Sequence, residues 1–120
     1  MKILVVDDHV EITDIVVAAL EGLSHQITVS NDARDAQSRL ENDAFDALIV
    51  DIIMPNKSGV ELIQYARKHR GMSRFLAMTG GGRSKNFMIL EALKSSFDIL
   101  TIQKPFRIDD LVAAVKSLED

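Results

Sequence analysis

Short apolar runs alternate with segments of helical periodicity along this 120-residue sequence, and this alternation most restricts its fold. A run of four or five apolar residues is typical of a strand buried on both faces of a parallel sheet. Strands that alternate with helices are joined by right-handed crossovers, which place helices on both faces of the sheet. The sequence therefore predicts an α/β fold with parallel strands at residues 3–6, 26–30, 46–50, 75–78 and 99–102.

The segments between these strands carry apolar residues at the spacing of one helix face. Asp32, Ser58 and Ser84 are suitable N-caps, and Gly22 is a plausible end of the first helix. Residues 80–82 are three glycines, which we interpret as a flexible connection. We expect helices at residues 9–22, 32–40, 59–69, 85–95 and 108–118, with Ile12, Ile15, Val16 and Ala19 inward in the first and Ile108, Leu111, Val112, Val115 and Leu118 inward in the last.

Composition limits the classes of protein to which the chain can belong. The length fits a single domain over residues 1–120, with ordinary apolar and charged fractions of 47% and 27%. The lack of cysteine excludes disulfides and thiolate metal sites and fits a reducing compartment, so we expect a cytoplasmic protein. No apolar run reaches the length of a membrane span or a secretory signal. The net charge of −4 argues against direct binding of nucleic acid.

Charged and hydroxyl side chains stand at the ends of four predicted strands. Asp7 and Asp8 follow the first strand, Asp51 the third, Thr79 the fourth and Lys104 the fifth. Ligands of parallel α/β sheets bind outside the carboxyl ends of the strands. We therefore expect these five side chains to converge on one site.

Three carboxylates in one crevice repel one another and call for a cation. Oxygen ligands favour a hard ion, and Mg2+ commonly binds one or two carboxylates together with waters and a phosphate. An aspartate can attack phosphorus to form an aspartyl-phosphate. Because Asp51 lies where a buried strand meets a loop, we predict that it is the reactive group of a phosphate-accepting site. Lys104 and Thr79 are suited to hold phosphoryl oxygens.

Four motifs in this order and spacing resemble the receiver domain of two-component signalling, the CheY-like family. They are V-V-D-D at 5–8, D-I-I-M-P-N-K-S-G at 51–59, M-T-G at 78–80 and K-P-F at 104–106. The resemblance covers essentially the whole chain. It implies a flavodoxin-like sheet in the order 2-1-3-4-5, with two helices on one face and three on the other.

The resemblance also implies a role for each site residue. Asp51 would be the phosphoacceptor, and its donor would be a phosphohistidine on a sensor histidine kinase or phosphotransfer protein. The implied Mg2+ ligands are Asp8, Asp51 and the Ile53 backbone carbonyl, with Asp7 acting partly through water. The groups implied to hold the phosphoryl oxygens are Thr79, Gly80 and Lys104.

Two features depart from the family pattern. Thr101 stands where receivers usually carry a switch tyrosine or phenylalanine, and the sequence ahead of the last strand lacks the Gly-Ala pair often seen there. The missing aromatic and the three glycines at 80–82 together resemble a subgroup of stand-alone receivers, and we expect no output domain. Residues 87–90 are all apolar, and at about 100° per residue at least one must face solvent or a partner. We predict a switch through Thr79 and Thr101 that acts on a downstream protein by way of residues 80–84, 85–95 and 99–102 and the last helix.

Alternative interpretations remain open at this point. A haloacid-dehalogenase-type phosphohydrolase also uses an aspartyl nucleophile, but it needs D-x-D, and Ile53 occupies the place of the second acid. A receiver-like interaction module that never uses phosphate is a third reading. Two other strand-end residues, Ser30 and Asn31, should lie to the side of the site. The histidines should be solvated and should bind no ligand: His9, His25 and His69.

Overall fold

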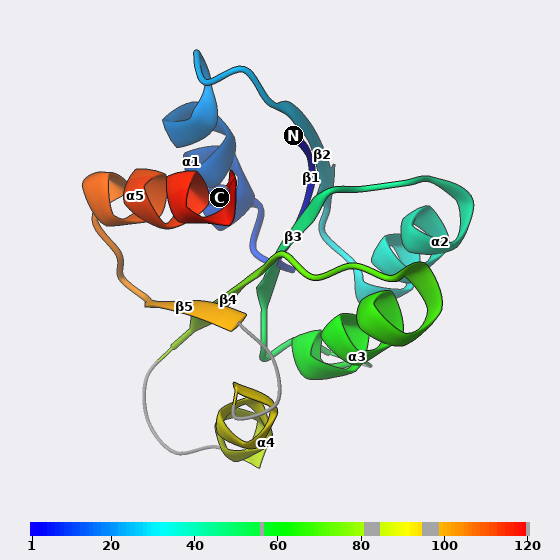
Figure 1. Ribbon diagram of the computed structural model, residues 1–120. Helices are drawn as coiled ribbons and strands as arrows, with labels where there is room; N and C mark the ends of the chain where they lie inside the picture. Colours follow the sequence, from blue (N-terminus) through cyan, green and yellow to red (C-terminus); the bar gives the residue numbers. More distant parts are fainter. Residues whose placement is uncertain (56, 81–84, 95–98, 120) are drawn as a thin grey trace.

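The computed structural model describes residues 1–55, 57–80, 85–94 and 99–119 of the chain. Within them strands and helices alternate as predicted (Figure 1). In chain order they are β1 (Lys2–Val6), α1 (Val10–Leu20), β2 (Gln26–Ser30), α2 (Ala33–Asn42), β3 (Ala47–Asp51), α3 (Gly59–Arg70), β4 (Phe75–Thr79), α4 (Lys85–Lys94), β5 (Ile99–Gln103) and α5 (Ile108–Glu119). None of the described helices is both long and apolar enough to cross a membrane.

The strands form one parallel sheet in the order β2-β1-β3-β4-β5, which confirms the predicted flavodoxin-like topology. β1 and β3 are neighbours at its centre, and Val6 lies opposite Val50. The residues that follow these two, Asp7 and Asp51, therefore lie at the same level of the sheet. The topology thus joins two carboxylates that are far apart in the sequence.

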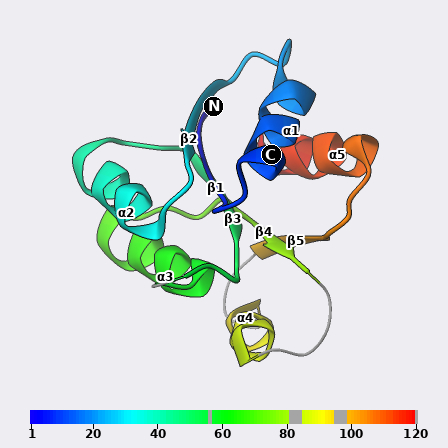
Figure 2. The ribbon, with the colours of Figure 1, turned by 180° about the vertical axis from the view of Figure 1, so that it is seen from behind.

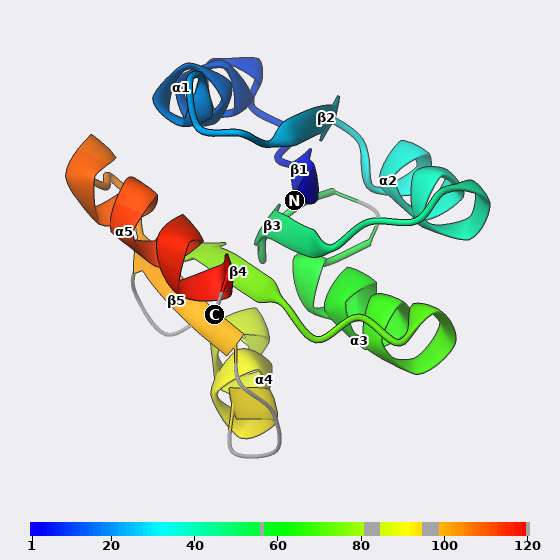
Figure 3. The ribbon, with the colours of Figure 1, turned by 45° about the horizontal axis from the view of Figure 1, so that its top comes forward.

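Alternate residues of the central strands pack on opposite faces of the sheet, as the pleat requires. Leu4 and Leu48 belong to the core beneath α2, α3 and α4, whereas Ile3 and Ile49 belong to the core beneath α1 and α5. Figures 1 and 3 show α1 and α5 together on one side and the other three helices on the other, and Figure 2 shows the same division from behind. The division of two helices and three is therefore confirmed.

Two of the three predicted N-caps are present. The Asp32 carboxylate accepts hydrogen bonds from two main-chain amides in the first turn of α2, and the Ser58 hydroxyl accepts one in α3. The third, Ser84, lies outside the described residues, as do residues 81–83 and Ser95. The predictions that concern those positions stay predictions.

Two residues that we expected on buried helix faces are exposed instead. Ile15 of α1 is 42% exposed and Ile108 of α5 is 46% exposed. The buried stripe of α1 consists of Thr13, Val16 and Leu20, spaced at i, i+3 and i+7. Ile15 lies about 100° away from Val16 around the helix, so it cannot share that stripe.

The apolar run on α4 divides between core and solvent. Leu90 is fully buried, whereas Met88 is 65% exposed. The prediction that at least one residue of 87–90 faces outward is therefore confirmed. The side chains of Phe87 and Ile89 lie outside the description.

The expectation that His25 is solvated is wrong. Its side chain is only 3% exposed, and Nε2 lies 2.9 Å from a Glu119 carboxylate oxygen. Its Nδ1 lies 3.0 Å from the Met1 amino nitrogen. The imidazole thus joins the start of the chain to the end of α5, a contact that depends on tertiary packing and leaves no local signal in the sequence.

Gly59 allows α3 to begin directly against the end of β3. A Cβ at this position would collide with the Asp51 carbonyl oxygen and lie 2.8 Å from the Ile52 Cα. The obstructing atoms are backbone, so no side-chain movement can relieve the collision. The glycine in the D-I-I-M-P-N-K-S-G motif is therefore required for the position of Asp51.

We expect Gly59→Ala to lower the free energy of unfolding by about 1–3 kcal/mol, as overpacking typically does. Gly80→Ala is the matched control, because a Cβ there meets no atom within 4 Å. Urea unfolding of both variants measures the difference. A Gly59→Ala protein as stable as Gly80→Ala would contradict the close approach described here.

Candidate functional site

The carboxyl ends of β1 and β3 supply two buried carboxylates. Asp7 and Asp51 are both buried, and the register of the two strands places them at the same level. Like charges this close raise the free energy of the folded state unless a cation lies between them. Asp7 and Asp51 therefore lie close together, as we expected from their positions at the ends of neighbouring strands.

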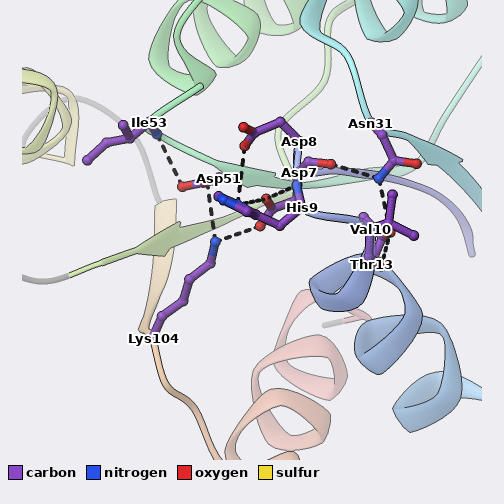
Figure 4. A network of polar contacts seen from close by, with 9 residues as sticks. All are labelled: Asp7, Asp8, His9, Val10, Thr13, Asn31, Asp51, Ile53 and Lys104. Atoms are coloured by element: carbon purple, nitrogen blue, oxygen red, sulfur yellow. Dashed lines mark hydrogen bonds and ion pairs between the residues drawn. The ribbon is translucent and has the colours of Figure 1, made fainter. Parts of the chain in front are cut away.

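Lys104 is the cation that lies between these carboxylates. Its Nζ donates to Asp7 Oδ2 at 2.6 Å and lies 3.3 Å from Asp51 Oδ2 (Figure 4). Burial alone would lower the pKa of Lys104, but the hydrogen bond to Asp7 and the charges of Asp51 and Asp7 raise it above the ordinary value. Lys104 therefore remains an ammonium at neutral pH.

The main chain around Asp51 holds the carboxylate in place. The Ile53 N–H donates to Asp51 Oδ1 at 3.1 Å. Burial raises the pKa of the Asp51 carboxyl above its ordinary value, and the Asp7 charge adds to the rise, while the Ile53 amide and Lys104 oppose it. Asp51 is thus a desolvated carboxylate with fixed orientation, which suits a nucleophile.

Asp8 differs from Asp7 in its hydrogen bonding. Both Asp7 oxygens are engaged, Oδ1 by the His9 main-chain N–H at 2.9 Å and Oδ2 by Lys104. Asp8 Oδ1 is buried and has no hydrogen-bond partner among the described residues. A buried oxygen of this kind needs a ligand, since leaving it unpaired costs about 1–3 kcal/mol.

Contrary to expectation, His9 has acidic neighbours. Its Nδ1 lies 3.2 Å from Asp7 Oδ1 and 3.4 Å from Asp8 Oδ1. The hydrogen bond with Asp7 raises the pKa of His9, and the charges of Asp8 and Asp7 add to this effect. His9 was missed because it is the N-cap residue of α1, where its side chain makes no capping hydrogen bond and the sequence gives no periodic signal.

Asn31 was also missed, because we expected it to lie to the side of the site. Its Nδ2 donates to the Asp7 main-chain carbonyl at 2.8 Å and lies 3.0 Å from Thr13 Oγ1. The Thr13 hydroxyl in turn donates to the Val10 carbonyl at 2.9 Å, as Figure 4 shows. This network ties the turn after β1 to both β2 and α1, so Asn31 positions the residues that follow Asp7.

The other predicted site residues lie on or beside β4 and β5. Thr79 is buried at the end of β4, one position beyond the residue that pairs with Asp51, and its carbonyl accepts from the Lys104 N–H at 2.6 Å. Gly80 is exposed. Thr101 is exposed on β5, two positions before the strand ends, and pairs with Ala77 of β4.

A family model described as the response regulator receiver domain matches residues 3–116. The chain belongs to this family. Receiver domains of two-component response regulators are phosphoacceptor signalling domains, which interact with histidine kinases and downstream effectors. The family match, together with the observed topology, confirms the resemblance that the four motifs indicated.

Relatives and solved structures agree with this assignment. TcrA, a transcriptional regulatory protein of Mycobacterium tuberculosis, is 29% identical over 98% of this chain and 46% of its own length. The chain spans about half the length of the curated relatives that it matches. A CheY-like receiver protein from Methanospirillum hungatei superposes with a TM-score of 0.83 at 29% identity, over 98% and 93% of the two chains. The BeF3-activated receiver domain of DrrB from Thermotoga maritima gives 0.80 at 25% identity, over 98% and 96%.

The receiver family generally binds Mg2+ at an acidic pocket, and the residues present here fit that ion. One ligand atom from each of Asp7, Asp8, His9 and Asp51 lies within 4.8 Å of the others. The Asp8 oxygen that has no hydrogen bond among the described residues supplies a hard donor of the type that Mg2+ prefers.

We expect Asn31→Ala to weaken Mg2+ binding by about tenfold, because hydrogen bonds behind metal ligands typically contribute at least that factor. The change removes the donor to the Asp7 carbonyl and leaves the ligands themselves intact. NMR-monitored Mg2+ titration of the Asp8 and His9 amide signals measures the affinity. Asn42→Ala is the matched control, since that amide bonds only within α2. Equal affinities in the two variants would contradict the positioning role.

Proposed function

We propose that Asp51 accepts a phosphoryl group from a phosphohistidine of a sensor histidine kinase or a phosphotransfer protein. An Asp51 oxygen forms the new O–P bond as the P–N bond of the donor breaks, and the leaving imidazole takes a proton from solvent. The observation that carries the proposal is the position of Asp51 between a fixed main-chain N–H and the Lys104 ammonium. Membership of the phosphoacceptor family supports the same reaction.

Lys104 is suited to stabilise the negative charge that the phosphoryl group would bring to the site. Before transfer it is shared between Asp7 and Asp51, and its main chain is fixed to Thr79. The phosphoryl group brings negative oxygens to the same place, and a charge-assisted hydrogen bond from the ammonium stabilises them. The Thr79 hydroxyl and the Gly80 main chain would hold the remaining oxygens.

The reaction is proposed to require Mg2+. Asp8, Asp51 and the Ile53 carbonyl would bind the ion directly. Asp7 would act through water, which agrees with its two oxygens already being engaged. When bound, the ion neutralises negative charge on the phosphoryl oxygens.

The readout is proposed to be a protein-binding surface made by residues 80–84, α4, β5 and α5. Met88 and Thr101 are exposed on this part of the molecule, and Lys104 connects it to the site through Thr79. Thr101 is too small to transmit a movement by ring rotation, so the change would pass through the main chain. The net charge of −4 supports a protein as the direct partner of these residues, although relatives such as TcrA are transcriptional regulators.

Labelling of Asp51 tests the phosphoacceptor role. Incubation with acetyl phosphate and Mg2+, followed by intact mass measurement, should add one phosphoryl group to the wild-type chain. Asp51→Asn should keep the fold and lose the label, because a carboxamide is not a competent nucleophile. Asp14→Asn, which changes an exposed carboxylate of α1, is the matched control and should label normally.

Other outcomes of the labelling experiment point to other functions. Labelling of Asp51→Asn at the wild-type rate would show that another residue is the acceptor. Catalytic release of phosphate from monoester substrates would favour the phosphohydrolase. A folded wild-type chain that never labels would favour the interaction module that does not use phosphate.

Amide exchange tests the proposed readout. Helix α4 carries the exposed Met88 of the proposed surface and the buried Leu90, so a rearrangement there should change the protection of its amides. We expect amide protection in α4 to change by about tenfold or more between the free protein and the protein with Mg2+ and BeF3−, a roughly 1.4 kcal/mol change in opening free energy. Helix α2, which packs on the same face of the sheet, is the internal control. Unchanged protection of α4 with full occupancy at Asp51 would refute the readout.

A further inference from the structure

His9 is the one imidazole that the described structure places against the acidic cluster (Figure 4). Its Nδ1 lies 3.2 Å from Asp7 Oδ1 and 3.4 Å from Asp8 Oδ1. The side chain is exposed and makes no capping hydrogen bond to α1, so the helix does not determine its direction. The proposed Mg2+ site uses the carboxylates but assigns no role to His9.

The distance between His9 Nδ1 and Asp8 Oδ1 fits two neighbouring ligands of one ion. In an octahedron with bonds of about 2.1 Å, adjacent ligand atoms lie about 3.0 Å apart. The distance of 3.4 Å from His9 Nδ1 to Asp8 Oδ1 exceeds that value by only a few tenths of an ångström. Asp8 Oδ1, the atom 3.4 Å from the imidazole, is also the buried oxygen without a hydrogen bond among the described residues.

We propose that His9 is a ligand of the divalent ion held by Asp8 and Asp51, in the place of one water, and that it makes the site prefer Mn2+ to Mg2+. An imidazole nitrogen adds little affinity for Mg2+, which prefers oxygen, whereas first-row transition metals accept it readily. The inference rests on the proposed function, because it concerns the ion of the phosphoacceptor site. It adds a nitrogen donor and a metal preference to that site.

The competing interpretation is that His9 is only an ion-pair partner of the two acids. A metal ion would then displace the imidazole, and Mn2+ would be bound by oxygen atoms alone. The two interpretations differ in one observable, which is direct bonding between a histidine nitrogen and the ion. Ligation needs the neutral imidazole, and binding of the ion releases its proton, so the measurements belong at mildly alkaline pH.

Pulsed electron paramagnetic resonance of the Mn2+-loaded chain tests the proposal directly. The wild-type spectrum should show modulation from a bonded nitrogen, and the frequencies should change when the protein is made with 15N-labelled histidine. The modulation should disappear in His9→Gln and persist in His69→Gln, which changes an exposed histidine of α3. The proposal is overturned if Mn2+ competes with Mg2+ for the site but its spectrum shows no coupling to a histidine nitrogen. The spectra of the two variants would not change that conclusion.

Affinities provide a second readout. Mn2+ should bind the wild-type chain at least about tenfold more tightly than Mg2+, and His9→Gln should lower the Mn2+ affinity by about tenfold while changing Mg2+ much less. Equal losses for both ions would overturn the metal preference. Labelling of the wild-type chain in Mg2+ separates the two proposals: labelling without nitrogen coupling rejects the role of His9 alone, and nitrogen coupling without labelling rejects the phosphoacceptor function alone.

Discussion

The contact of one ammonium with two buried carboxylates is the interaction on which the site depends. Asp7 is fully buried and Asp51 nearly so, and Lys104 lies within 3.3 Å of an oxygen of each. Removing one partner of a buried ion pair typically costs about 3–5 kcal/mol, because the remaining charge is left uncompensated. The carboxyl ends of β1, β3 and β5 are therefore held together electrostatically as well as by the sheet. In the proposed reaction, a phosphoryl group transferred to Asp51 would lie beside the positive charge of Lys104.

Much of this arrangement could be predicted from the sequence, because parallel strands impose simple rules. Short buried runs fixed the strand positions, and alternation with helices implied the crossovers. Once the strand order is 2-1-3-4-5, Asp7 and Asp51 must be neighbours and Lys104 must lie close to Thr79. The requirement for glycine at position 59 was not predicted, because the close approach of α3 to the β3 backbone appears only in the folded structure.

The residues that were missed depend on side-chain direction, which strand periodicity does not determine. Asn31 lies just beyond the edge strand β2, yet its amide reaches back to the Asp7 carbonyl. His25 is buried only because the start of β2 meets the end of α5. The helical spacing of apolar residues predicted that Ile15 faces the core. The buried stripe of α1 is narrow, however, and Thr13 lies in it instead. In each case the deciding contact is made by an element distant in the sequence.

The main chain of Lys104 offers a route from the site to the proposed readout surface. Its Nζ contacts the two carboxylates, while its N–H donates to the Thr79 carbonyl at the end of β4. Gly80 follows Thr79 directly and leads toward α4, and Gln103 precedes Lys104 at the end of β5. A displacement of the ammonium toward a phosphoryl oxygen would therefore act on the ends of two neighbouring strands at once. The proposed coupling would pass through the hydrogen bond between the two strand ends and would not require an aromatic ring at position 101.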